Sequence, residues 1–261
     1  TGRQFGIFLG PAVGGGLMLL IGPGAGLIVN VLIYLPLLWW LRKAPYGEKA
    51  RAPERQVAAA GAGGFADAVN TLRAVSGNKT IISMIALAGL TSLFVGNAFL
   101  AQMPEYAHDL GTEKADFSYT VLLGANAAGA FIGGIFLEAH GMLRSTPQTA
   151  VVLAILWCFT IAGFAATSSY PVAVALMFVA GFLSLAYTSM AQALVQLEAP
   201  THLRGRLIGL FQMSNNGLRA FSGVTVGLLG SLIGIHGSLA LSALALLTVT
   251  AVLLAFSMRS R

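Results

Sequence analysis

Long apolar segments follow one another along almost the whole chain, and they limit its possible folds more than any other feature. A helix needs about 20 apolar residues to cross a bilayer, within a range of roughly 17 to 25. Only 9% of the 261 residues are charged, against about 25% in soluble domains. The chain is therefore predicted to be an all-α integral membrane protein with about eight transmembrane helices. The predicted spans are approximately 3–21, 25–41, 80–103, 117–137, 147–167, 171–197, 207–233 and 238–258.

The charged residues alternate between the two ends of these predicted spans. Segment 42–79 is the only long polar stretch, and it carries seven basic residues against three acidic ones. Because cytoplasmic loops are enriched in Lys and Arg, this segment is predicted to be cytoplasmic, and the acidic loop 104–116 is predicted to lie outside. Retention of basic loops inside also explains the net charge of +6. The expected partner is thus the lipid bilayer and not a nucleic acid.

Segment 42–79 contains a short stretch with helical periodicity. Phe65, Val69, Leu72 and Val75 fall on one face, while polar residues fall off that face. This spacing predicts an amphipathic helix. Such a helix either lies along the membrane surface or serves as a packing strut, and the second role fits better because its polar face is poor in Lys and Arg.

Glycines recur at every fourth position near the start of the chain, at Gly6, Gly10 and Gly14. On a helix they form a flat stripe that lets a neighbouring backbone approach. Pro11 removes a backbone donor within that stripe, which a membrane tolerates only where neighbouring helices or a cavity satisfy the freed carbonyl. A bare glycine repeat is typical of an ordinary packing helix. With Pro11 and the Gly14-Gly15 pair, the spacing resembles the antiporter motif on the fifth helix of major facilitator superfamily exporters.

Several polar residues interrupt the apolar spans. An arginine at the position of Arg219 costs at least about 2.5 kcal/mol, so it is expected to face a partner or a wet cavity. Both a tether to helix carbonyls and a substrate contact remain open. Arg3-Gln4-Phe5 resembles Arg219-Ala220-Phe221, as expected if the first two spans repeat the last two. The residues predicted to face one transport cavity are Arg3, Asn97, Gln102, Glu105, Asn126, Asn215 and Arg219.

Glu105 has two possible roles. A partly desolvated carboxylate can carry a transported proton. Alternatively, Glu105 flanks a helix end beside Pro104, which is the simpler interpretation.

Two loops resemble superfamily signatures at the inner ends of helices. Gly134, Glu138 and Gly141, followed by Arg144, resemble the second-half copy of the loop signature, although Ala139, Met142 and Leu143 stand where the family usually has cations. The loop from Glu198 to Arg206 resembles the run before the eleventh helix of efflux members. The resemblance implies a cytoplasmic gate in which Glu138 pairs with Arg204 or Arg206. The implied gate residues are Glu138, Arg144, Glu198, Arg204 and Arg206.

The resemblance covers essentially the whole chain as helices five to twelve of a major facilitator superfamily protein, in the branch of bacterial exporters related to the enterobactin exporter. It implies a fragment lacking four upstream helices. Residues 1–41 would end the N-terminal half, 42–79 would be a cytoplasmic linker, and 80–261 would form the C-terminal six-helix half.

By the same resemblance, the intact protein is an inner-membrane monomer that exports a drug-type or siderophore-type small molecule by alternating access, in exchange for protons. Two other classes stay open: a half-size carrier acting as a homodimer, and a non-transporting membrane sensor or assembly factor. No enzyme activity, cofactor or metal is expected. The sequence shows no nucleophile with a base and no cluster of metal ligands.

Overall fold

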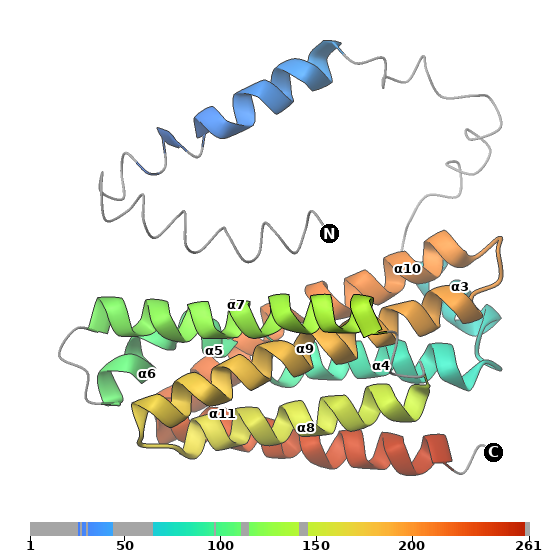
Figure 1. Cartoon of the computed structure of the whole chain (residues 1–261). Helices are drawn as coiled ribbons and strands as arrows, with labels where there is room; N and C mark the ends of the chain where they lie inside the picture. The colour runs from blue at the N-terminus through green and yellow to red at the C-terminus, as the bar shows by residue number, and fades with distance from the viewer. Residues whose placement is uncertain are drawn as a thin grey trace.

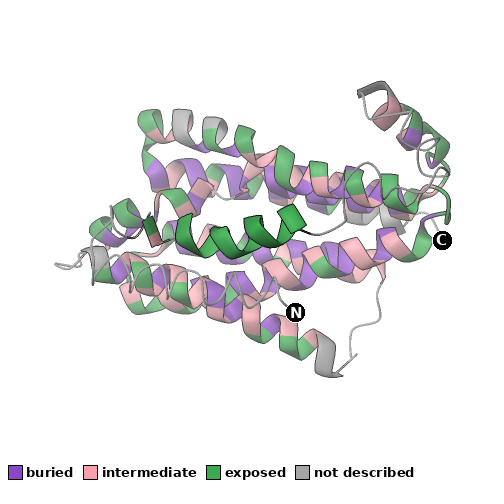
Figure 2. Ribbon diagram, turned by 90° about the horizontal axis from the view of Figure 1, so that it is seen from above, coloured by how far each residue is buried: buried purple, intermediate pink, exposed green. Residues whose placement is uncertain are grey.

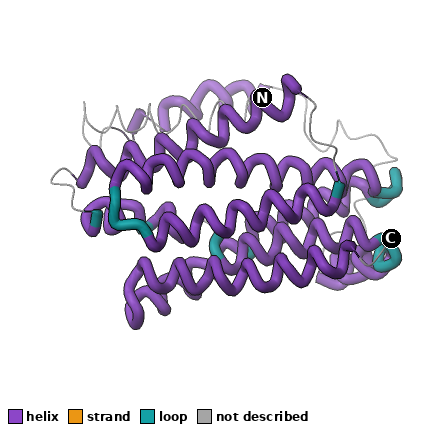
Figure 3. The backbone as a smooth tube through the Cα atoms, turned by 60° about the horizontal axis from the view of Figure 1, so that its bottom comes forward, coloured by secondary structure: helices purple, strands orange, loops and turns teal. Residues whose placement is uncertain are grey.

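The structure is a computed structural model that describes residues 26, 28–29, 31–43, 65–96, 98–110, 115–140 and 146–258. Within these ranges the chain is almost entirely helical and contains no strand (Figure 3). The all-α architecture expected from the apolar spans is therefore confirmed.

Five long helices form an elongated bundle (Figure 1). Helix α9 packs against α4, α7 and α8, and α11 packs against α4 and α8. The short helices α3 and α10 lie at one end of the bundle, and α6 lies at the other. The long helices are α4 (Lys79–Phe94), α7 (Ala115–His140), α8 (Pro147–Ala166), α9 (Tyr170–Glu198) and α11 (Arg219–Met258). The short ones are α3 (Phe65–Ala74), α5 (Ala98–Ala101), α6 (Met103–Asp109) and α10 (Arg204–Gln212).

The outer surface of this bundle is apolar. In Figure 2 the exposed residues run along the outer sides of the helices, and they include Phe159, Leu232 and Val252, which are more than half exposed. Apolar surface of this extent marks a face that contacts lipid or another apolar partner. Among the described residues, five stretches are long and apolar enough to cross a membrane: Lys79–Ala101, Phe117–Leu137, Pro147–Ala166, Tyr170–Glu198 and Leu229–Leu253.

A further helical segment covers residues 31–43, and all of its residues are exposed. Near its end, the Lys43 ammonium lies 3.9 Å from the centroid of the Trp39 ring. This is a cation–π contact. Tryptophan is enriched at membrane–water interfaces, and Lys is enriched in the cytoplasmic loops beside them.

Helices α7 and α9 approach closely enough for their backbones to touch. A Cβ atom added at Gly129 would collide with the Phe178 carbonyl oxygen, and one added at Gly181 would collide with the Asn126 carbonyl oxygen. Small residues permit this approach where membrane helices cross. The contact fixes α7 and α9 against each other.

The predicted span 80–103 is broken in the structure. Helix α4 begins after Asn78, whose side chain accepts a hydrogen bond of 3.1 Å from the Ile81 N–H. It ends at Phe94, and Gly96 follows with a φ of +50°. The Gly96 N–H donates to the Thr91 carbonyl at 2.9 Å. A left-handed glycine is a common end for a helix, and here it turns the chain into the short helices α5 and α6.

The last two predicted spans are also irregular. Between α10 and α11 lies a π-helical segment, η2 (Met213–Gly217), inside the predicted span 207–233. The bend between the last two spans falls at Gly234, which has a φ of +79° and a ψ of 160°. Gly234 is the first residue of the gap between the predicted spans 207–233 and 238–258, ahead of the turn expected at His236 and Gly237. Glycine tolerates positive φ without steric cost, so Gly234 takes the bend.

Helix α3 occupies most of the predicted amphipathic segment. Ala68 and Leu72 pack against the hydrophobic core, while Thr71 and the following Val75 are buried. At the same end, Asp67 forms an ion pair of 3.2 Å with Arg206 of α10. These contacts favour the packing strut over a helix that only lies along a membrane surface.

Candidate functional site: a polar cavity between interrupted helices

A polar cavity of about 60 Å³ lies between α4, α7, α8, α9 and the η2–α11 junction. Its position is near the middle of the bundle, since Trp157 lies ten residues into the 20-residue helix α8. Phe99, Trp157 and Tyr187 supply aromatic walls, and the Trp157 and Tyr187 ring centroids are 5.5 Å apart. The polar lining consists of Thr91, Ser92, Asn126, Ser184, Asn215 and Arg219.

The two interrupted helices meet at this cavity. The Ser92 hydroxyl, one turn before the break at Gly96, donates a buried hydrogen bond of 2.7 Å to the Asn215 carbonyl in η2. π-Helical segments inside α-helices are frequent at functional sites, because they rotate the residues that follow. Here the segment precedes Arg219, the first residue of α11.

Asn126 projects from α7 toward α9. Its side-chain amide donates a hydrogen bond of 3.3 Å to the Met177 carbonyl, beside the close crossing of the two helices. Asn126 is thus held at the cavity by the same contact that joins α7 to α9.

The structure brings together three of the seven predicted cavity residues: Asn126, Asn215 and Arg219. Gln102 and Glu105 lie outside this lining, although Phe99 and Leu100, which follow the break at Gly96, belong to it. Gln102 precedes α6, and Glu105 is exposed in its first turn after Pro104. That position favours the helix-end role of Glu105. Arg3 and Asn97 lie outside the described residues.

Three of the predicted gate residues, Glu198, Arg204 and Arg206, lie at the end of the bundle that holds α3 and α10. Arg206 pairs with Asp67, and the Asn78 side-chain amide donates a hydrogen bond of 3.2 Å to the Glu198 carboxylate. Arg204 is exposed at the start of α10. Arg144 and the side chain of Glu138 fall outside the described part, so the predicted pairing of Glu138 stays a prediction. The antiporter-type residues Gly6, Gly10, Pro11, Gly14 and Gly15 also fall outside it.

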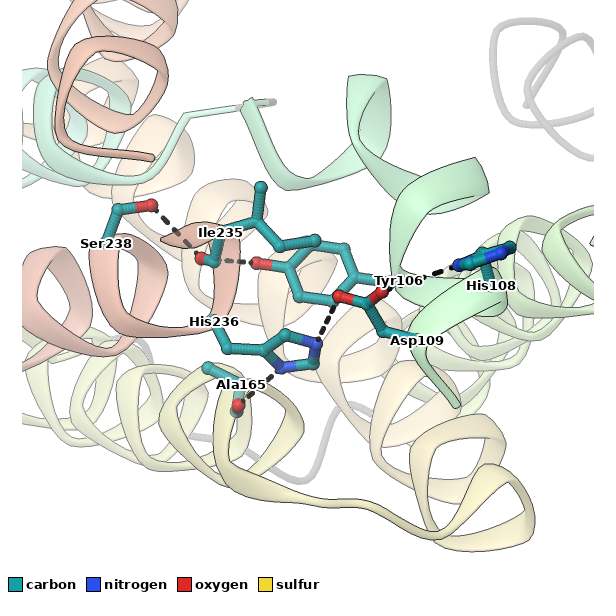
Figure 4. Close-up of polar contacts among 7 residues, drawn as sticks. All are labelled: Tyr106, His108, Asp109, Ala165, Ile235, His236 and Ser238. Carbon is teal, nitrogen blue, oxygen red and sulfur yellow. Dashed lines mark hydrogen bonds and ion pairs between the residues drawn. The ribbon is translucent and has the colours of Figure 1, made fainter. Parts of the chain in front are cut away.

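Tyr106, Asp109 and His236 form a polar cluster at the opposite end (Figure 4). The Tyr106 hydroxyl donates to the Ile235 carbonyl at 2.9 Å, and His236 Nε2 lies 3.5 Å from the Asp109 carboxylate. His236 Nδ1 lies 2.8 Å from the Ala165 carbonyl, to which it must donate because a carbonyl oxygen only accepts. These contacts tie α6 to α8 and to the bend in α11.

The environment of Tyr106 keeps its phenol neutral. Burial raises the pKa of Tyr106, and the nearby Glu105 and Asp109 carboxylates raise it further. Asp109 and His236 are far apart in the chain. No local spacing signals the cluster.

Replacing Tyr106 with Phe is expected to destabilise the protein only slightly. The variant loses one buried hydrogen bond, but the Ile235 carbonyl keeps a 3.0 Å bond from the Ser238 hydroxyl. The expected loss is about 0.5–1 kcal/mol, at the low end for a hydrogen bond, measured as a lower midpoint of thermal unfolding in detergent. The control is Tyr34→Phe, at an exposed tyrosine. Equal midpoints for the two variants would contradict a role for this bond.

Comparison with known proteins identifies the family. The sequence profile of the Major Facilitator Superfamily matches residues 1–223. A search of curated protein sequences gives no match. The fold is similar to the crystal structure of a bacterial homologue of the human lysosomal transporter Spinster, in an inward-facing and unoccupied conformation, with a TM-score of 0.56 and 18% identity.

That alignment covers 95% of this chain but only 64% of the Spinster homologue, so this chain spans less than two thirds of its length. At 18% identity the likeness shows a shared fold. The family follows from the profile, which matches most of the chain and includes the cavity residues up to Arg219. The chain belongs to the Major Facilitator Superfamily.

Proposed function

We propose that the full-length protein transports a small molecule across a membrane by alternating access, with the cavity around Arg219 on the transport path. The observation that carries this proposal is a polar cavity with a cationic side chain in the middle of apolar helices. Ionisable residues inside a membrane protein are costly, and they characteristically line substrate or ion pathways. Two interrupted helices border the cavity, as is typical of transporter binding sites near the bilayer midplane.

The direction of transport and its coupling form a finer part of the proposal. We propose export of a drug-type or siderophore-type molecule in exchange for protons, by a monomer in the bacterial inner membrane. The support is the glycine and proline spacing over residues 6–15, which resembles an antiporter motif and lies within the family match. The chain would then supply the last two helices of the first half, the linker and the second half.

The contacts at the α3 and α10 end support a cytoplasmic gate in this proposal. Basic residues at that end favour a cytoplasmic position for it by the positive-inside rule. The Asp67–Arg206 ion pair and the Asn78–Glu198 hydrogen bond join the linker helix and the start of α4 to α10 and α9. Exposed ion pairs contribute only about 0–1 kcal/mol, so such contacts can open and close during a transport cycle.

Replacing Arg219 with Ala is expected to remove most of the export activity. The experiment measures accumulation of drugs and siderophores in cells that express the full-length gene, with membrane levels of the variants matched. Loss of a charge-assisted contact of about 1.5–3 kcal/mol corresponds to at least about a tenfold lower rate. His202→Ala is the control, since His202 is an exposed residue outside the cavity.

Three outcomes are distinguishable. Lower accumulation with the wild type and with His202→Ala, but not with Arg219→Ala, supports the proposal. If Arg219→Ala exports normally, Arg219 is a structural tether. If every version behaves like the empty vector over a broad compound panel, a sensor or assembly role replaces transport.

A further inference from the structure

We propose that the cavity between α4, α8, α9 and α11 binds the anionic group of the substrate, a carboxylate or a similar oxyanion. This inference rests on the proposed transport function and specifies the substrate class of the same site. Three features of the cavity carry it: its hydrogen-bond donors, its charge and its size.

Two lining side chains are donors that cannot accept hydrogen bonds. These are the Arg219 guanidinium and the Trp157 indole N–H. Trp157 is only 3% exposed, and among the described residues its Nε1 atom has no hydrogen-bond partner. A buried donor without a partner is costly, so an acceptor on a bound molecule stabilises it. The chemistry of this pair favours an acceptor-rich ligand group.

The charge of the lining has one sign. The acidic residues whose side chains the structure describes are Asp67, Glu105, Asp109 and Glu198, and none of them lines the cavity. Arg219 therefore makes the described lining cationic. Planar guanidinium groups bind carboxylates through two parallel, charge-assisted hydrogen bonds. The neighbouring Asn126 amide adds neutral polarity and no opposing charge.

The volume decides how much of a substrate fits. A cavity of about 60 Å³ has room for about four water molecules at roughly 15 Å³ each. The enclosed part has room for a single small group such as a carboxylate, and the pocket is partly open, so the rest of a ligand would extend beyond it. The aromatic walls from Phe99, Trp157 and Tyr187 suit a carboxylate attached to a planar ring.

The test compares benzoate with benzamide, which have nearly the same shape but differ in charge. Binding to the purified full-length protein is measured by calorimetry at low salt. Wild type is expected to bind benzoate about tenfold more tightly than benzamide, consistent with the strength of a charge-assisted bond. Arg219→Gln is expected to lower the affinity for benzoate about tenfold and to leave the affinity for benzamide unchanged. Arg219→Lys is expected to retain a preference for benzoate.

Two further variants distinguish the loss of a hydrogen-bond donor in the cavity from a general loss of positive charge. Trp157→Phe keeps an aromatic side chain but removes the indole N–H, and it is expected to weaken benzoate binding about threefold to tenfold. Arg73→Gln removes an exposed cation of α3, outside both the cavity and the Asp67–Arg206 ion pair, and is expected to change the affinity for neither ligand. If Arg219→Gln does not fold, Trp157→Phe and Arg219→Lys still test the proposal.

The proposal is overturned if wild type binds benzamide as tightly as benzoate, if neither ligand binds, or if Arg73→Gln weakens benzoate binding as much as Arg219→Gln does. Its failure is distinct from failure of the transport proposal. Export of neutral and anionic compounds at equal rates would support the transport proposal and contradict the anion-binding site. Selective benzoate binding without export of any compound would support the anion-binding site and contradict the transport proposal.

Discussion

Alanine at Gly129 or at Gly181 is expected to prevent the protein from folding normally. A single Cβ at Gly129 would overlap the Phe178 carbonyl oxygen, and one at Gly181 would overlap the Asn126 carbonyl oxygen. Neither oxygen can rotate aside as a side chain could, since each belongs to the backbone of a helix. The helices would have to separate, at a cost at or above the upper end of the roughly 1–3 kcal/mol typical of overpacking.

The matched control is Gly124→Ala on the same helix, where an added Cβ meets nothing within 4 Å. Alanine is favoured over glycine in a helix by up to about 1 kcal/mol, so this control should be as stable as wild type or more so. The measurement is the yield of monodisperse protein in detergent and its unfolding midpoint. If all three alanine variants behave alike, the close crossing of α7 and α9 is not what determines stability here.

Alanine at Gly96 is expected to have the second largest effect. The φ of +50° at this residue favours glycine, and a non-glycine residue in a left-handed conformation costs about 1–2 kcal/mol. An added Cβ would also collide with the Ser222 hydroxyl and the Ser92 carbonyl. Because Gly96 lines the cavity, both the unfolding midpoint and benzoate binding should fall.

A double variant separates the two causes of this loss. Ser222→Ala removes the hydroxyl that the new methyl group would meet, so Gly96→Ala combined with Ser222→Ala should recover part of the stability. The backbone strain and the contact with the Ser92 carbonyl would remain. Gly77→Ala is the control, at a turn glycine with open space around its Cα atom. If Gly96→Ala is as stable as Gly77→Ala, the left-handed conformation at position 96 is not needed for stability.

Much of the fold could be predicted from apolar periodicity. Helices α8 and α9 begin and end within a residue or so of the expected spans 147–167 and 171–197, because a proline marks each start and a short polar turn joins them. The break at Gly96 could not be predicted in this way. The run 80–103 is mostly apolar and long enough for one span, and the space that requires glycine at position 96 is bounded by Ser92 and by Ser222, a residue distant in the chain.

Some residues of the candidate site could be predicted from the sequence, and others could not. Asn126, Asn215 and Arg219 could be predicted, because polar side chains in apolar spans require partners inside the protein. Trp157 was missed, since a tryptophan in an apolar run is typical of an ordinary core residue. Only the structure shows that its N–H lacks a partner in the described part of the chain. The cluster of Asp109 and His236 depends on tertiary packing, which local spacing does not encode.

The backbone contact between α7 and α9 has a mechanical consequence. Helices separated by side chains can slide as rotamers change, but a glycine seated against a carbonyl leaves no such freedom, so these two helices move as one stiff body. The breaks in helical geometry lie elsewhere, at Gly96, in η2 and at Gly234, along helices that pack against each other. A change of shape in this bundle would therefore be expected to bend α4, α10 and α11 against a stationary α7–α9 pair.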